Sequence, residues 1–143
     1  MKMILAACIV LLFVTAAFAA AKRDESKITR AIKSLRPLIH AIGEVETGGI
    51  PESRRDTATG DNGLARGRYQ IHANCAIDTG HSHMDAHDPE TARRIMAMYW
   101  LMYAPEAVEN RDYETLARIW NGGPRGCTKP ATAGYWQRVK ARL

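Results

Sequence analysis

Two carboxylates with unlike surroundings are the side chains of this sequence best suited to acid–base chemistry. The apolar helical pattern that ends at Gly48 and Gly49 places Glu46 in the last turn of a helix. Partial burial and the negative end of the helix dipole both disfavour an ionised carboxylate at such a position. Glu46 is therefore a candidate general acid, which must hold its proton near neutral pH. The alternative is that Glu44 and Glu46 are ordinary exposed glutamates.

The second carboxylate belongs to a glycine-rich turn. Asp61 lies between Gly60 and the pair Asn62-Gly63, and glycines let the backbone approach a ligand closely. A loop of this kind can set Asp61 opposite Glu46. Such a pair can hydrolyse a glycosidic bond, one carboxyl acting as the acid and the other as nucleophile, base or electrostatic stabiliser. Taken alone, the turn is also consistent with an ordinary surface loop.

A third segment combines an amide with aromatic rings. Asn121 precedes two glycines and Pro124, and Tyr135 and Trp136 follow within the next helical segment. An asparagine amide can bond a hydroxyl or acetamido group of a sugar, while aromatic rings stack on sugar faces. As a bare pattern this is also a capped helix.

The elements that must position these residues are predicted to be mainly helical. Apolar residues recur at helical spacing, and the capping signals predict helix starts near Ser26, Asp88, Asp112 and Thr132. Pro37 is expected to restart the first helix. Residues 50–67 are rich in turn-forming residues and predict turns or a short irregular hairpin.

The first nineteen residues predict a secretory signal peptide. Lys2 supplies a positive start, an apolar stretch follows, and Ala17 and Ala19 fit the recognition positions for cleavage. A membrane anchor is the alternative, but the apolar segment is short. We therefore expect residues 20–143 to form one exported domain, secreted or periplasmic, with no stable membrane anchor after removal of the signal.

Export would place the cysteines in an oxidising compartment. In such a compartment Cys75 and Cys127 are expected to form a disulfide, with two separate buried thiols as the alternative.

Four of the five histidines cluster between His72 and His87, but their spacing fits no standard metal motif. We expect no metal and no cofactor.

The charge and length exclude several classes of protein. The formal net charge of +5 suits an anionic partner such as bacterial cell wall. Nucleic acid is disfavoured because no predicted helix carries a continuous basic stripe. With 143 residues, the chain is too short for a barrel enzyme or for paired dinucleotide-binding halves.

The order of the motifs resembles the lysozyme superfamily. Glutamate at a helix end, a Gly-Asp turn, Gly-Arg-Tyr-Gln-Ile, Asn-Gly-Gly-Pro and Thr-x-x-Tyr-Trp follow one another over residues 39–139. The pattern is most similar to the invertebrate-type (destabilase-like) lysozymes and related small secreted bacterial proteins. The resemblance implies an α+β, mainly helical, lysozyme-like fold with a small irregular β-hairpin after the catalytic helix.

The resemblance also assigns roles. It implies that Glu46 is the acid and that Asp61 is the second carboxylate, with Asp56 as the alternative. The positions implied to bind substrate are Tyr69, Gln70, Asn121 and Tyr135.

Three departures distinguish this sequence from the family pattern. Residues 73–75 replace the Tyr-Trp pair usual after Gln-Ile, Trp120 replaces the usual histidine before Asn-Gly-Gly, and at most one disulfide remains. These departures favour a bacterial-type member.

The implied function is that of a monomeric muramidase. It would cleave the β-1,4 bond between N-acetylmuramic acid and N-acetylglucosamine in peptidoglycan. The alternatives are a lytic transglycosylase that uses Glu46 alone and a non-catalytic peptidoglycan-binding module of the same fold.

Overall fold

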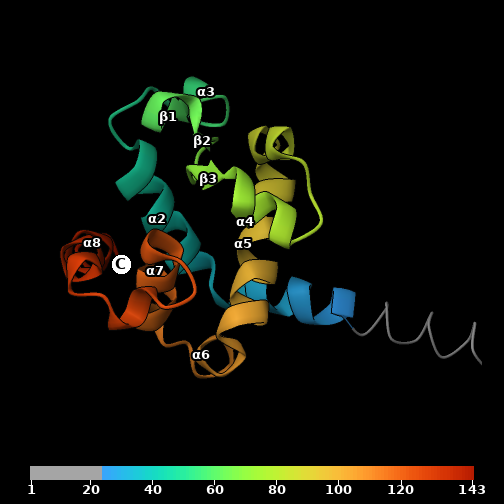
Figure 1. Ribbon diagram of the computed structural model, residues 1–143, viewed down its shortest axis with the longest axis vertical. Helices are drawn as coiled ribbons and strands as arrows, with labels where there is room; N and C mark the ends of the chain where they lie inside the picture. Colours follow the sequence, from blue (N-terminus) through green and yellow to red (C-terminus); the bar gives the residue numbers. More distant parts are fainter. Residues whose placement is uncertain (1–23) are drawn as a thin grey trace, which may run out of the picture.

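The computed structural model describes residues 24–143, so the predicted signal peptide of residues 1–19 lies outside the described part. A helix over residues 24–34 leads into the labelled elements of Figure 1. The helices are α2 (Arg36–Thr47), α3 (Glu52–Arg55), α4 (Ala73–Asp78), α5 (Pro89–Tyr103), α6 (Pro105–Asn110), α7 (Tyr113–Gly122) and α8 (Ala133–Lys140). Short 3-10 turns are η1 (Asp61–Gly63), η2 (His83–His87), η3 (Gly126–Thr128) and η4 (Pro130–Thr132). No described helix is long and apolar enough to cross a bilayer.

The fold is α+β and mainly helical, as the sequence predicts. Three two-residue strands, β1 (Thr59–Gly60), β2 (Ala65–Arg66) and β3 (Ile71–His72), form an antiparallel sheet in that order. This sheet follows α2 in the chain and lies at one end of the molecule (Figure 1). The predicted hairpin after the helix that carries Glu46 is confirmed.

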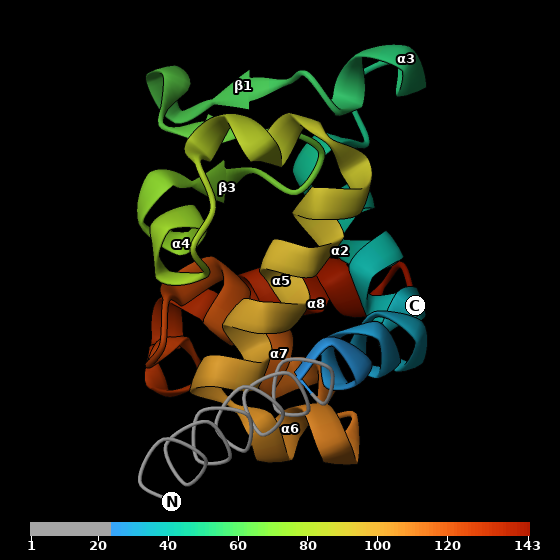
Figure 2. The same cartoon turned by 90° about the vertical axis from the view of Figure 1, so that its right-hand side faces the viewer.

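The core lies between the helices. Figure 2 shows α5 running through the middle of the molecule with α4 beside it, the sheet at one end and α6 at the other. Trp100 of α5 is completely buried, and its indole N–H donates to the carbonyl of Leu116 on α7 at 3.0 Å. The other large apolar side chains that are fully buried are Leu35, Leu38, Ile42, Ile71, Ile95, Met96, Leu116 and Val139.

Two of the predicted helix caps are present. The Asp88 carboxylate accepts from the backbone N–H of Thr91 at 2.7 Å, and that of Asp112 accepts from Thr115 at 3.1 Å. Both bonds satisfy N–H groups that have no partner within the helix. α8 also starts where predicted, directly after Thr132, but the Thr132 hydroxyl bonds the carbonyl of Gly126 at 2.7 Å and does not cap the helix.

The predicted disulfide between Cys75 and Cys127 is also wrong in this structure, where both residues are free thiols. Cys75 lies on α4, which packs against β3, η2 and α5, whereas Cys127 lies on η3, which packs against α7. Each cysteine is thus held among the neighbours of its own element. Burial raises the pKa of the Cys75 thiol to about 12, so this thiol remains protonated and unreactive at neutral pH.

Candidate active site

Glu46 occupies the last turn of α2 and is half-buried. Burial is the largest influence on the carboxyl and raises its pKa. The phenol hydroxyl of Tyr135 donates to Glu46 Oε1 at 2.7 Å and lowers the pKa, as does the positive charge of Arg138. The net pKa of Glu46 is raised, which favours the protonated form required of a general acid.

The end of α2 is fixed to the turn between β2 and β3 by the residue after Glu46. Thr47 is buried, and its hydroxyl lies 3.1 Å from the carbonyl oxygen of Gly43 and 3.0 Å from that of Arg68. Glu44 makes a different set of contacts, since its carboxylate forms an ion pair with Arg55. The two glutamates of the motif are therefore not equivalent.

Asp61 begins η1, directly after β1, with left-handed backbone angles. Its φ is +46° and that of Asn62 is +55°, a region that Asp and Asn tolerate better than other non-glycine residues. The exposed Asp61 carboxylate lies 3.1 Å from Nε2 of His72. The charge of Asp61 raises the pKa of Glu46, and the charge of His72 lowers it. The fold therefore places Asp61 and His72 close enough to Glu46 to influence its ionisation.

His72 is a site residue that the sequence pattern alone does not single out, because four histidines fall between positions 72 and 87. The signal was its strand position. In β3 the neighbouring Ile71 is buried and His72 is exposed, and alternate residues of a strand face opposite sides. The strand register pairs His72 with Ala65, close to the turn that carries Asp61.

Asp56, the alternative second carboxylate, is engaged elsewhere. Its carboxylate lies 2.8 Å from Nε of Arg68 and, with Glu44, lines a cavity that does not include Glu46. The structure thus places Asp61, and not Asp56, in the neighbourhood of Glu46.

Gln70 supports the turn that holds Asp61. It has a φ of +52°, and its side-chain amide donates to the carbonyl of Gly67 at 2.9 Å. A Cβ atom on Gly60 would lie 2.0 Å from the Gln70 side-chain oxygen. The close approach of Gln70 therefore requires glycine next to Asp61.

Tyr69 and Tyr135 are both buried, so neither offers an open ring face to a sugar. The Tyr69 ring lies against Gly43 and faces the cavity that contains Asp56. Tyr135 is 2% exposed and directs its hydroxyl to Glu46. Asn121, in contrast, is exposed near the end of α7.

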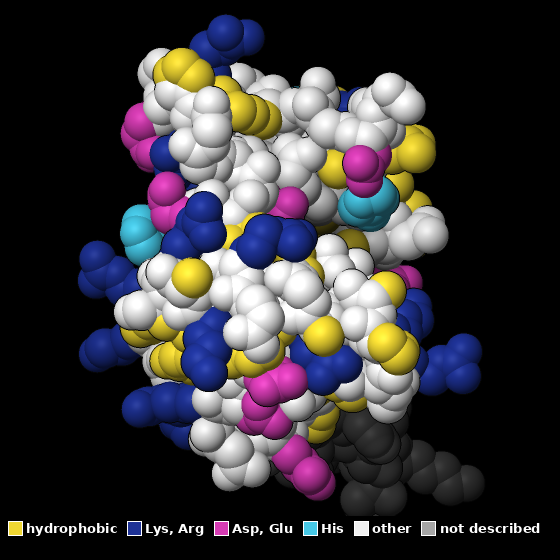
Figure 3. Space-filling model, turned by 90° about the vertical axis from the view of Figure 1, so that its left-hand side faces the viewer, with side chains coloured by type: hydrophobic (Ala, Val, Ile, Leu, Met, Phe, Trp, Pro, Cys, Tyr) yellow, Lys and Arg dark blue, Asp and Glu magenta, His cyan; other side chains and the backbone are white. Residues whose placement is uncertain are grey.

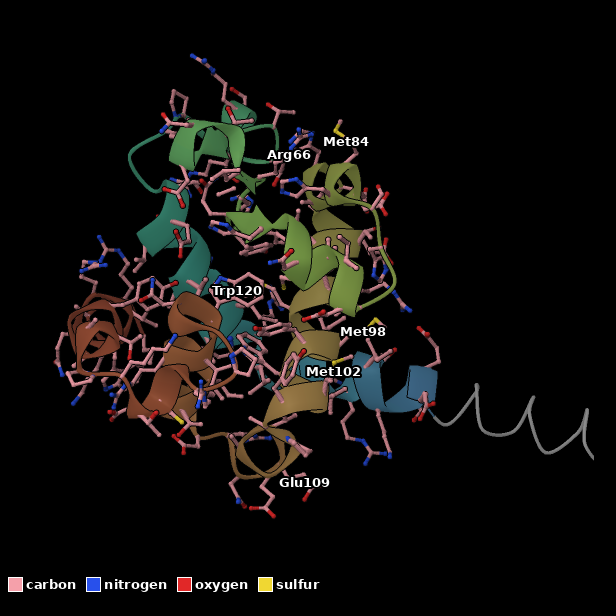
Figure 4. All side chains as sticks on the ribbon, viewed as in Figure 1. Arg66, Met84, Met98, Met102, Glu109 and Trp120 are labelled. Atoms are coloured by element: carbon pink, nitrogen blue, oxygen red, sulfur yellow. The ribbon has the colours of Figure 1, made fainter. Side chains whose placement is uncertain are left out.

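Trp120 links α7 to the turn between β2 and β3. Figure 4 shows it on α7, and its indole N–H donates to the Tyr69 carbonyl at 3.2 Å. Its ring also meets those of Tyr99 and Trp100 edge to face, with centroids about 6 Å apart. The tryptophan that replaces the family histidine is therefore a packing residue of this aromatic group.

Besides His72, two of the four histidines between His72 and His87 bond to other groups of the protein. His83 Nε2 lies 2.8 Å from the carbonyl oxygen of Ile71, and His81 Nδ1 lies 3.2 Å from the Thr79 hydroxyl. Within residues 24–143 no group of three or more His, Cys, Asp or Glu side chains is arranged to hold a metal ion.

Lys and Arg side chains spread over one face of the molecule. Figure 3 shows them across its lower half. The exposed Arg138 and Lys140 of α8, followed by Arg142, supply positive charge near the end of the chain. Arg138 also influences the pKa of Glu46, which links this charge to the site.

The mainly helical frame, the half-buried glutamate at a helix end and the aspartate on the following turn define a lysozyme-like protein. No family model matches the chain. The chain is 36% identical to a lysozyme of Ostrea edulis over 81 residues, which is 54% of this chain and 59% of the relative. It is also 36% identical to lysozyme 1 of Crassostrea virginica over 80 residues, or 53% of this chain and 44% of the relative.

A short segment is more similar still. Over 27 residues the chain is 63% identical to invertebrate-type lysozyme 6 of Caenorhabditis elegans, covering 19% of this chain and 20% of the relative. Among solved structures, the crystal structure of Aeromonas hydrophila PliI in complex with Meretrix lusoria lysozyme contains a similar chain. The match has 30% identity and a TM-score of 0.60, and it covers 73% of this chain and 87% of that chain.

The chain belongs to the invertebrate-type lysozyme family, which confirms the resemblance seen in the sequence. The aligned regions span about half the length of the curated relatives.

Proposed function

We propose that the protein is a secreted muramidase that hydrolyses the β-1,4 bond between N-acetylmuramic acid and N-acetylglucosamine in peptidoglycan. The observation that carries this proposal is the contrast between two neighbouring carboxyl groups. Glu46 has a pKa raised by burial, whereas Asp61 is exposed and lies beside His72. Unlike environments of this kind separate the acid from the charged carboxylate.

The roles follow from these environments. Glu46 gives its proton to the glycosidic oxygen as the bond to the anomeric carbon breaks. The Asp61 carboxylate stabilises the oxocarbenium-like carbon or attacks it. A water molecule then adds to that carbon and returns a proton to Glu46. The Tyr135 hydroxyl holds the Glu46 carboxyl in place throughout.

The substrate proposal also rests on charge and on exposed polar groups. The basic side chains around α8 suit the anionic cell wall. The exposed amide of Asn121 can bond a sugar hydroxyl or acetamido group. The apolar segment within residues 1–19 supports export, with the protein acting as a monomer outside the cytoplasm.

Glu46→Gln tests the catalytic assignment. Gln keeps the shape and can still accept from Tyr135 but supplies no proton. Release of reducing muropeptides from purified peptidoglycan should fall about 10²–10⁴-fold, the contribution typical of general acid–base catalysis. Glu44→Gln is the matched control in the same helix, and it should retain activity.

Two results would contradict the proposal. A Glu46→Gln protein as active as the wild type would remove Glu46 from catalysis. Wild-type protein that binds peptidoglycan without releasing any muropeptide would instead identify a non-catalytic binding module.

The role of Asp61 separates the muramidase from the alternative activity, that of a lytic transglycosylase. The Asp61 side chain is 67% exposed, so its substitution creates no buried defect. In a transglycosylase the 6-hydroxyl of the muramic acid attacks the anomeric carbon and Glu46 alone moves the proton. Asp61→Asn would then retain activity, and the products would carry anhydromuramic ends. If the protein is a muramidase, Asp61→Asn should lose activity and the products of the wild type should carry reducing ends.

A further inference from the structure

A cavity of about 660 Å³ lies apart from Glu46, between the helix of residues 24–34, α2, the β2–β3 turn and the start of α5. It is lined by the other side of α2, including Ile39, His40 and Gly43. Glu46, Asp61 and Tyr135 do not line it. A ligand in this cavity would therefore leave the proposed catalytic residues free.

The acidic side chains of the cavity wall are all paired with arginines. Glu44, Glu52 and Asp56 line it, and each forms an ion pair with Arg55 or Arg68. These carboxylates are therefore largely neutralised by fixed guanidinium groups.

The remaining cations of the wall have no such partner. Lys33, Arg36 and Arg93 line the cavity and make no ion pair with any residue between 24 and 143. His40 lines the same region. The excess of positive charge in the cavity suits an anionic ligand.

Tyr69 adds a directed hydrogen-bond donor. Its ring is 4% exposed and is held against α2, where a Cβ on Gly43 would lie 3.2 Å from the ring. Burial raises the pKa of the Tyr69 hydroxyl, and the Arg93 guanidinium beside it lowers that pKa. No residue within 24–143 accepts a hydrogen bond from this hydroxyl, although it lines the cavity. A hydroxyl on a fixed ring that has no acceptor within the protein is well placed to donate to a ligand.

The apolar part of the wall indicates the rest of the ligand. Ile32, Ile39 and Pro89 line the same cavity as Arg36 and Arg93. A hydrated inorganic ion would gain nothing from these side chains, whereas a peptide with alkyl groups would bury them. A guanidinium pairs well with the planar carboxylate at the end of such a peptide.

We propose that this cavity is a second binding site, which takes the free carboxylate of a short peptide between Arg36, Arg93 and the Tyr69 hydroxyl. In peptidoglycan that ligand is the peptide stem attached to muramic acid, and only this choice of peptide rests on the proposed function. Binding at the cavity is independent of bond cleavage at Glu46.

The test measures binding of diacetyl-Lys-D-Ala-D-Ala to the purified protein by calorimetry and by ¹H–¹⁵N chemical shifts. The peptide acid should bind, and its C-terminal amide should bind at least about tenfold more weakly because the charge-assisted bonds are lost. Shift changes should centre on residues 36–43, 69 and 93.

Matched variants assign the site. Arg36→Gln, which alters an exposed side chain, and Arg93→Gln should each weaken binding about tenfold, and Tyr69→Phe should weaken it less. Arg30→Gln is the control, since Arg30 is exposed and lines a different groove. Glu46→Gln should bind the peptide normally even if it is inactive, which separates this proposal from the catalytic one.

Three outcomes would overturn the site. The amide could bind as tightly as the acid, both arginine variants could bind normally, or the shift changes could centre on Glu46 and Asp61.

Discussion

The hydroxyl of Tyr135 donates a 2.7 Å hydrogen bond to Oε1 of Glu46, although 89 residues separate them in the chain. The bond joins α8 to the last turn of α2. It stabilises the ionised carboxylate, while burial of Glu46 acts in the opposite direction and is the larger effect. The state of Glu46 thus depends on a contact that only the folded chain creates.

Tyr135→Phe should move the pH profile of peptidoglycan cleavage. Without the Tyr135 donor the pKa of Glu46 rises further, so the protonated acid persists to higher pH. The falling, alkaline limb of kcat/KM should therefore shift to higher pH. Stability at neutral pH should fall by about 1–2 kcal/mol, because a half-buried carboxylate loses its partner. Rates measured across pH and urea unfolding check both effects.

Tyr113→Phe is a matched control for that substitution, because Tyr113 is half-buried on α7 without contact to Glu46. Its pH profile should match that of the wild type. A Tyr135→Phe profile that moves to lower pH, or does not move, would contradict the assigned role of the hydrogen bond.

The raised pKa of Glu46 also predicts a cost in stability. A carboxyl whose pKa is higher in the folded state binds more protons there than in the unfolded chain, so the free energy of unfolding falls as pH rises between the two pKa values. Glu46→Gln removes this loss. The variant should be more stable than the wild type by about 1 kcal/mol at pH 8, with a smaller difference at pH 4. Thermal unfolding at both pH values measures this, and a difference that grows toward acid pH would refute it.

Local chemistry allowed much of the helical frame to be predicted. Asp88 and Asp112 cap helices as expected because their carboxylates need only the next turn of their own segment. The first helix also restarts near Pro37 and ends before Gly48. Gly48, however, has a φ of −61°, so the helix ends there without the left-handed cap expected of glycine.

The side-chain roles at the site depended on tertiary packing and were less predictable. Tyr69 faces the cavity by Gly43, and Tyr135 faces Glu46, because of how α2 packs against the β2–β3 turn and α8. No local pattern specifies those directions. The disulfide could not be predicted from local sequence either. Two cysteines in an exported domain suggested a bridge, but α4 and η3, which carry Cys75 and Cys127, pack against different neighbours.

Gly67 should be far less tolerant of substitution than Gly63. Both have positive φ, +75° and +91° respectively, so alanine at either position costs about 1–2 kcal/mol of backbone strain. At Gly67 an added Cβ would also lie 2.0 Å from the backbone oxygen of Ala86, whereas at Gly63 it meets open space. Gly67→Ala should therefore lose at least about 2 kcal/mol more than Gly63→Ala. Urea unfolding followed by tryptophan fluorescence compares them, and equal losses would show that the contact with Ala86 is unimportant.

The free thiols of Cys75 and Cys127 predict that the protein does not depend on oxidation. Its melting temperature should be unchanged by a reductant, whereas loss of a structural disulfide typically costs about 2–5 kcal/mol. Alkylation of the unfolded, unreduced protein followed by mass measurement should label both cysteines. In the folded protein Cys75 should react slowly at neutral pH, because burial keeps its thiol protonated with a pKa of about 12. A Cys75→Ala protein is the control that assigns the slow site. Masses that show no labelling until reductant is added would establish the bridge and contradict the structure at these two residues.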